Sequence, residues 1–171
     1  VRHSLLMSNS WSVSQCPNHY GDPVAEYAAM GAGVGLCDRS HLGRVQISGS
    51  DGLDLLNRLS TQKMETFSIG EGALTVVTTS KGRVVDLIAC TMRPGHILCL
   101  TSPDRQSAFI EWIDFFVFSE DVEIHDVTDA TSMFGLAGPK AEALLKEFGA
   151  PVNELSAYHS VNTIIEGVEV L

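Results

Sequence analysis

The chain has 171 residues, which is enough for one domain with a buried core. Its formal net charge of -10 argues against a nucleic-acid-binding protein, because such proteins present a basic face to the phosphate backbone. No apolar run is as long as a membrane span and no signal-peptide pattern is visible, so we expect no membrane contact and a cytoplasmic location. The four cysteines and six histidines show no metal-site spacing, which predicts reduced thiols and no metal centre.

In chain order, residues 1–18 are polar and irregular, and we expect the folded domain to span residues 19–171. Asp22-Pro23 predicts the start of a helix, because Asp caps helices well and Pro suits the first turn. The later patterns predict strands at 36–38, 44–47, 96–101, 122–127 and 132–137, and helices over 50–59, 102–116 and 139–148. Helices between strands and hairpins indicate an α+β fold rather than a doubly wound parallel sheet. Because residues 168–171 resemble an interrupted strand, we expect this to be the N-terminal part of a longer protein.

Residues 72–90 predict a β-hairpin that contains the clearest chemical signal in the chain. Two runs rich in β-branched residues flank residues 80–83, where Gly82 can supply the positive φ of a tight turn. Asp86 lies in the second run among apolar residues, where a buried charge is costly without a partner or a task. An outward-facing strand residue is the simpler interpretation. A half-buried Asp86 could instead bind the N–H groups of a heterocycle or relay a proton, with Lys81 and Arg83 near an acidic tail of that ligand.

One internal repeat and two smaller motifs complete the pattern. Residues 45–56 and 134–145 share a strand, a glycine, a helix start and a Leu-Leu pair, which chance or duplication of a β-α-β unit can explain. Ser40-His41 is typical of a turn rather than of half a catalytic dyad. Trp112 has helical spacing to Phe109 and Phe116, which favours a place in the core over ligand stacking.

Several separated motifs resemble the folate-binding domain of aminomethyltransferases, the T-protein of glycine cleavage, and its YgfZ-type relatives. The resemblance covers residues 20–148. The motifs that carry it are Tyr20-Gly21-Asp22-Pro23-x-x-Glu26-Tyr27, Gly33-Val34-Gly35-Leu36-Cys37-Asp38-x-Ser40-His41-Leu42-Gly43-Arg44, Ile47-x-Gly49-x-Asp51, Gly70-Glu71-Gly72, Lys81-Gly82-Arg83-x-x-Asp86-Leu87-Ile88 and Leu136-x-Gly138-Pro139-Lys140-Ala141.

The resemblance implies an α+β fold built from duplicated units with mixed or antiparallel sheets and a tetrahydrofolate site, for a 5,10-methylene or 5-formyl derivative. Asp86 matches the carboxylate that binds the pterin and assists one-carbon transfer, although the family usually has two adjacent acids there. Leu74 stands where T-proteins commonly carry a Tyr, and Ser102 where they carry an Asn near the pterin. Together with Arg83, these residues form the expected folate site.

Three functions are compatible with this resemblance. The leading hypothesis is a tetrahydrofolate-dependent one-carbon transferase that resembles the T-protein and meets a lipoyl carrier protein. The alternative is a YgfZ-type folate-binding accessory protein for iron–sulfur cluster maintenance or tRNA modification, which residues 81–83 and 116–123 favour. A third is a non-catalytic or demethylase-like paralogue that keeps the fold.

Overall fold

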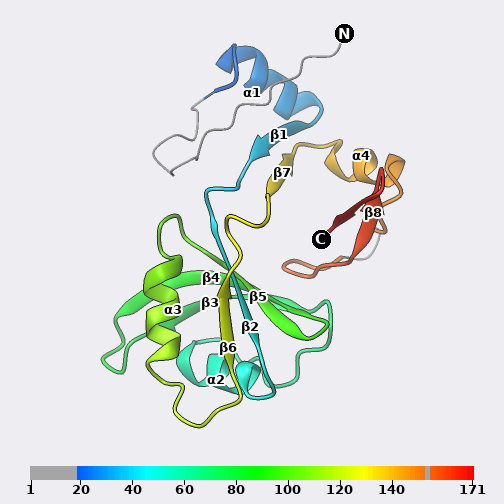
Figure 1. Ribbon diagram of the computed structural model, residues 1–171. Helices are drawn as coiled ribbons and strands as arrows, with labels where there is room; N and C mark the ends of the chain where they lie inside the picture. Colours follow the sequence, from blue (N-terminus) through cyan, green and yellow to red (C-terminus); the bar gives the residue numbers. More distant parts are fainter. Residues whose placement is uncertain (1–18, 153–154) are drawn as a thin grey trace.

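The computed structural model describes residues 19–152 and 155–171, and within them it has four helices and nine strands (Figure 1). The helices are α1 (Pro23–Ala32), α2 (Gly52–Leu59), α3 (Gln106–Asp114) and α4 (Ala141–Glu147). The strands are β1 (Gly35–Asp38), β2 (Gly43–Ser48), β3 (Gly72–Thr78), β4 (Val84–Arg93), β5 (His96–Thr101), β6 (Glu123–Asp126), β7 (Phe134–Ala137), β8 (Thr163–Ile165) and β9 (Val168–Val170). The predicted α+β class is confirmed. The segment expected to be irregular, 1–18, lies outside the described residues.

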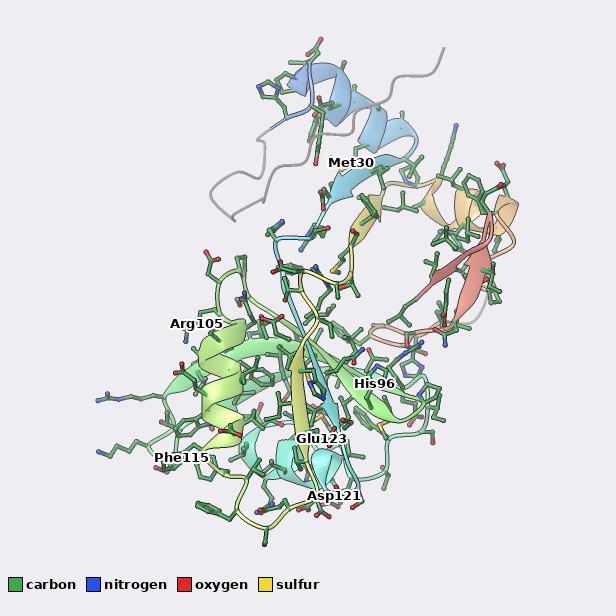
Figure 2. The ribbon with its side chains drawn as sticks, in the orientation of Figure 1. Met30, His96, Arg105, Phe115, Asp121 and Glu123 are labelled. Carbon is green, nitrogen blue, oxygen red and sulfur yellow. The ribbon has the colours of Figure 1, made fainter. Side chains whose placement is uncertain are left out.

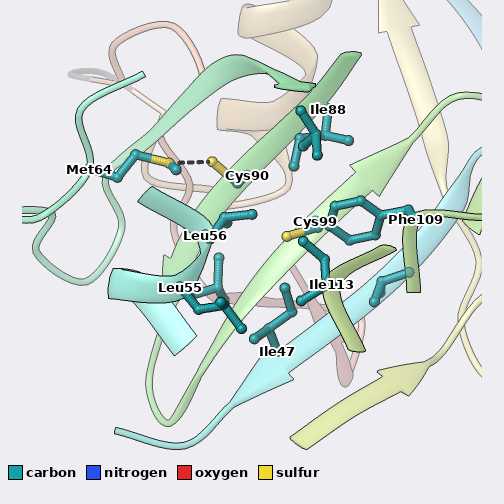
Figure 3. Close-up of a cluster of buried hydrophobic side chains, with 12 residues drawn as sticks. Ile47, Leu55, Leu56, Met64, Ile88, Cys90, Cys99, Phe109 and Ile113 are labelled. Carbon is teal, nitrogen blue, oxygen red and sulfur yellow. Dashed lines mark hydrogen bonds between the residues drawn. The ribbon is translucent and has the colours of Figure 1, made fainter. Parts of the chain in front are cut away.

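Five strands form the larger sheet, in the order β3-β4-β5-β2-β6 with every neighbouring pair antiparallel. α2 and α3 cover one of its faces, and Figure 3 shows their side chains meeting those of the strands. This core contains Ile47, Leu55, Leu56, Ile88, Cys90, Cys99, Phe109 and Ile113, all almost fully buried. Burying each large apolar side chain contributes about 1.5–3 kcal/mol. The core therefore fixes β4 and β5, the two strands nearest the candidate site.

The β3–β4 hairpin is confirmed, and it has a bulge immediately before Asp86. Gly82 has φ 71° in the turn, as predicted, and its N–H donates to the Thr79 carbonyl at 2.8 Å. Val77 pairs with Asp86 but Thr78 pairs with Val84, so Val85 is an extra residue on β4. Bulges of this kind bend a strand and redirect the neighbouring side chain, and they are common beside active sites.

The two proline-containing helix starts behave differently. At α1 the prediction is confirmed, because Asp22 Oδ1 accepts from the N–H groups of Val24 at 2.9 Å and Ala25 at 3.2 Å. At α3 the predicted start at residue 102 is wrong, because the helix begins at Gln106. The Ser102 N–H is held by Asp86, and Asp104 has φ 57°, a left-handed conformation that a helix does not allow.

The chain divides into two lobes. The large lobe is the five-stranded sheet with α2 and α3, and the small lobe comprises α1, β1, β7, α4, β8 and β9, drawn above it in Figure 1. The chain runs from β1 to β2 and returns from β6 to β7, and both strand pairs, β1·β7 and β2·β6, are antiparallel. The two segments therefore travel side by side from one lobe to the other. We call this passage, residues 38–44 and 126–133, the crossing.

The Glu120 carboxylate, in the loop between α3 and β6, has a lowered pKa. Four groups lower the pKa of Glu120 from 4.5 to about 2: the Phe118 N–H, the Ser119 N–H, the Arg58 guanidinium at 3.1 Å, and then the backbone of Glu120 itself. Because the folded-state pKa is lowered, the associated stability is present above the ordinary pKa and is lost as the pH falls towards about 2.

We therefore expect the Glu120 carboxyl to titrate with a midpoint of about 2 when followed by NMR. Arg58→Met should raise this midpoint only part of the way to 4.5, because the backbone hydrogen bonds to the carboxylate remain. A wild-type midpoint near 4.5 would show that the loop does not hold the carboxylate in solution.

No helix within residues 19–152 and 155–171 is both long enough and apolar enough to cross a lipid bilayer.

Candidate functional site

Asp86 is a buried carboxylate in an otherwise apolar strand. Its residue is 5 % exposed, on the face of the sheet that carries the core. Asp86 Oδ1 accepts from the N–H of Leu87 at 2.9 Å, and Oδ2 accepts from the N–H of Ser102 at 2.9 Å. Each carboxylate oxygen can accept a further hydrogen bond, so the group has capacity left for a ligand. The outward-facing interpretation of Asp86 is therefore wrong.

Ser102 is the second predicted residue that the structure brings to this place. It follows directly after β5, and its backbone is fixed on both sides. Its N–H binds Asp86, while its carbonyl accepts from Thr101 Oγ1 at 3.1 Å and from the Arg105 N–H at 3.1 Å. Ser102 thus lies on a short, anchored connection between β5 and α3, with its backbone N–H on the carboxylate.

Leu74 and Arg83 are not brought to Asp86 in the same way. Residues that pair across antiparallel strands share a face, and the pairing of Val77 with Asp86 places Leu74, three residues away, on the opposite face. Leu74 is 41 % exposed there. Arg83 is exposed in the hairpin turn, where its N–H donates to Thr79 Oγ1 at 3.1 Å. Only Asp86 and Ser102 of the predicted set are in direct contact.

Arg105 is a neighbour that the sequence did not indicate. Its Nη2 donates to the Val85 carbonyl at 2.7 Å, so the Arg105 guanidinium binds the backbone of the bulge residue that precedes Asp86. Figure 2 shows Arg105 at the start of α3 and Phe115 at its other end. An exposed arginine before a helix carries no sequence signal of its own, because its partner is a backbone carbonyl.

Two shallow hollows lie elsewhere in the described structure. One of about 300 Å³ is lined by Val85, Ala108, Glu111, Trp112 and Phe115 between β4 and α3. The other, of about 500 Å³, lies at β8 and β9. Neither includes Asp86. Trp112 is half-buried against the core, as predicted.

The motif at Asp38–Arg44, which carries much of the family resemblance, is structural in its local contacts. Ser40 and His41 form the predicted turn. The pKa of Asp38 is lowered chiefly by the Ser40 side chain and further by the Ser40 N–H, which donates to Asp38 Oδ1 at 2.8 Å. Ser40 Oγ in turn accepts from the Met133 N–H at 3.0 Å, which joins the two segments of the crossing.

The thiols and metal-binding side chains give no second site in the described ranges. Cys37, Cys90 and Cys99 are free there, with the latter two buried, while Cys16 lies outside those ranges. Burial raises the pKa of both the Cys90 and the Cys99 thiols, which keeps them protonated and unreactive. Over residues 19–152 and 155–171 no three His, Cys, Asp or Glu side chains gather as a metal ion would require.

Comparison with known proteins identifies similar sequences and similar solved structures. The sequence matches the family model described as the GCVT N-terminal domain over residues 9–171. A chloroplastic protein of Arabidopsis thaliana, whose name describes it as a transferase, is 34% identical over 116 residues, which are 67% of this chain and 27% of that protein. The aminomethyltransferases of Rubrobacter xylanophilus and Thermotoga maritima are 31% and 26% identical over 159 residues, or 92% of this chain and 42% and 44% of theirs.

A solved structure shares the fold. The glycine cleavage system aminomethyltransferase T from Bartonella henselae matches with a TM-score of 0.72 at 18% identity, covering 83% of this chain and 38% of that one. Across these proteins, the chain spans between 27% and 44% of their length.

Proposed function

Since the chain belongs to the GCVT N-terminal domain family, we propose that it forms the folate-binding part of a tetrahydrofolate-dependent one-carbon transferase that resembles the glycine cleavage T-protein. Relatives named aminomethyltransferase match 92% of the chain, which supports a transferase of this type. The observation that carries the proposal is the buried Asp86 carboxylate, held by two backbone N–H groups beside Ser102.

The residues at this place fit a reduced pterin. A pterin presents neighbouring ring N–H and amino donors, and a fixed carboxylate is the acceptor that matches them. The Leu87 and Ser102 N–H groups orient the Asp86 carboxylate before a ligand arrives, so little freedom is lost on binding. Ser102, whose N–H binds this carboxylate, also carries a hydroxyl that can donate or accept a hydrogen bond. Bound tetrahydrofolate would supply the nitrogen that takes up the one-carbon unit.

In this proposal Arg83 acts at longer range than Asp86. Its exposed cation in the hairpin turn can attract the acidic tail of a folate, whereas Leu74 lies on the other face of the sheet. We therefore assign pterin binding to Asp86 and Ser102. Leu74 would contact a folate only if the ligand reaches round the edge strand β3.

Asp86→Asn in the full-length protein should weaken the binding of 5-formyl-tetrahydrofolate by about 10-fold or more, because a charge-assisted hydrogen bond is lost while the side-chain shape is kept. Titration calorimetry measures the change, with circular dichroism to confirm the fold. Asp114→Asn is the matched control, since Asp114 is an exposed carboxylate at the far end of α3. Unchanged affinity in Asp86→Asn would remove Asp86 from the site.

A YgfZ-type accessory protein is the second candidate, favoured by residues 81–83 and 116–123. The two candidates differ in turnover rather than in folate binding. Full-length protein supplied with tetrahydrofolate and an aminomethylated lipoyl carrier should transfer the one-carbon unit if the T-protein proposal holds. Folate binding with no transfer would favour the accessory function.

A further inference from the structure

The turn that follows β5 has a fixed shape. The Arg105 N–H donates to the Ser102 carbonyl at 3.1 Å, which closes a four-residue turn over residues 102–105. Pro103 occupies its second position and Asp104, with φ 57°, its third. A proline followed by a residue of positive φ is the pattern of a type II turn. Because proline fixes its own φ, the contacts of Ser102 set the position of the whole turn.

Two bonds join this turn to the bulge in β4. The Ser102 N–H donates to Asp86 Oδ2 at 2.9 Å, and Arg105 Nη2 donates to the Val85 carbonyl at 2.7 Å. Val85 is the extra residue of the bulge, and Asp86 is the next residue along the strand. A displacement of the turn would therefore change the direction in which the carboxylate is held. How firmly the Asp86 carboxylate is oriented depends on how firmly Ser102 is fixed.

Thr101 provides the buried contact that fixes Ser102 to the sheet. Its Oγ1 donates to the Ser102 carbonyl at 3.1 Å. Thr101 lies two residues after Cys99, so the two side chains share the face of the sheet that carries the core. Thr101 is 2 % exposed, and bulk water therefore has little access to its hydroxyl. The other donor to this carbonyl, the Arg105 N–H, belongs to the turn itself and cannot anchor the turn to β5.

Gly43 leaves room for this hydroxyl. It pairs directly with Thr101 in the register of β2 and β5. A Cβ at Gly43 would lie 2.8 Å from Gln106 Cβ and closer still to Thr101 Oγ1. Gly43 lies within β2 and is not among the described glycines with positive φ, so the close approach, and not the backbone conformation, requires glycine here. The glycine that ends the motif over residues 38–43 is therefore linked through Thr101 and Ser102 to the candidate site.

We propose that Thr101 is a positioning residue for the Asp86 carboxylate, and that Gly43 is glycine because it must admit the Thr101 hydroxyl. The hydroxyl fixes Ser102, and the Ser102 N–H then holds Asp86 Oδ2 in one direction before a ligand arrives. Such preorganisation raises affinity, because less freedom is lost on binding. Folate is the ligand here because this role rests on the proposed function, whereas the bonds of Ser102 depend on no ligand.

Thr101→Val in the full-length protein removes the hydroxyl and keeps the shape of the side chain. The Ser102 amide should then exchange with solvent about 10-fold faster, measured by NMR relative to the Cys99 amide in β5. The affinity for 5-formyl-tetrahydrofolate, measured by titration calorimetry, should fall about 5-fold, which corresponds to one neutral hydrogen bond. Thr101→Ser keeps the hydroxyl and should show the wild-type value of both. Gly43→Ala should speed the exchange of Ser102 in the same way, because its Cβ displaces the hydroxyl.

Thr75→Val is the matched control for the loss of a buried threonine hydroxyl. Thr75 is also 2 % exposed and pairs with the core residue Ile88, so it lies on the same face of the sheet. Its Oγ1 accepts from the Gln62 N–H at 3.0 Å, in the loop before β3. Thr75→Val should lower the stability of the protein without changing the exchange of Ser102 or the affinity for folate.

Three results would overturn the proposal. Wild-type exchange of the Ser102 amide in Thr101→Val would mean that another contact fixes the turn. An equal loss of folate affinity in Thr75→Val would reduce the effect to a general loss of stability. Faster exchange with wild-type affinity, in a protein whose Asp86→Asn variant binds folate weakly, would mean that Ser102 does not position the carboxylate. If Asp86→Asn binds folate as the wild type does, the proposed function fails, and the exchange of Ser102 alone decides whether Thr101 positions Asp86.

Discussion

Arg44→Met is expected to destabilise the protein by about 3–4 kcal/mol, because it removes a buried guanidinium that binds several otherwise unpaired carbonyl groups. Arg44 is 4 % exposed, in the crossing between the lobes. Its Nη1 donates to the carbonyls of Ser40 and Leu42, its Nη2 to those of Thr128 and Thr131, and its Nε to Thr131 Oγ1. Methionine fills a similar volume but donates no hydrogen bond.

Urea unfolding measures the effect of Arg44→Met as a lower midpoint at unchanged slope. Lys81→Met is the control, since Lys81 is exposed in the hairpin turn and its loss should change stability by less than about 0.5 kcal/mol. If both variants unfold at the wild-type midpoint, water satisfies the carbonyls and the crossing does not depend on Arg44.

Most of the strands and helices are predictable from the sequence because their signals are local, although β8 (Thr163–Ile165) was not predicted. The β-branched runs around Gly82 and the Asp22-Pro23 pair determine the hairpin and α1 within a few residues. Arg44 shows the limit of such signals. It lies in a correctly predicted strand, but its partners at residues 128–131 are brought to it only by the tertiary fold. The start of α3 was misplaced for the same reason, since the Ser102 N–H binds Asp86 from another strand.

The candidate site was predictable in part. Asp86 was conspicuous because a charge among apolar strand residues requires a partner, and the structure supplies two N–H donors. Ser102 was predicted as a site residue only from the family resemblance, because a serine after a strand carries no distinctive signal in the sequence. The position of Leu74 on the opposite face depends on the β3–β4 register, which turn composition does not determine when a bulge at Val85 shifts it.

Gly49→Ala is expected to destabilise the protein by about 3 kcal/mol, because a left-handed backbone and a steric clash add at the same residue. Gly49 has φ 100°, and a Cβ there would lie 2.6 Å from the Asp121 carbonyl carbon and closer still to its oxygen. These are backbone atoms, so no side chain can move aside. The loop before β6 would have to shift, and with it the bonds of Ser50 to Asp121.

Gly82→Ala separates the two causes, because Gly82 has φ 71° but nothing within 4 Å of an added Cβ. The free energy of unfolding of Gly82→Ala should fall by only about 1 kcal/mol, which is the cost of the left-handed backbone without a steric clash. Gly138 matches Gly49 in the sequence repeat of 45–56 and 134–145, and a Cβ there would lie 2.5 Å from the Gly33 carbonyl oxygen. Gly138→Ala should therefore destabilise the turn after β7 as Gly49→Ala does the turn after β2. Calorimetric unfolding of the three variants gives the comparison. Equal losses of stability at Gly49 and Gly82 would mean that the close approach of Gly49 to Asp121 is absent in solution.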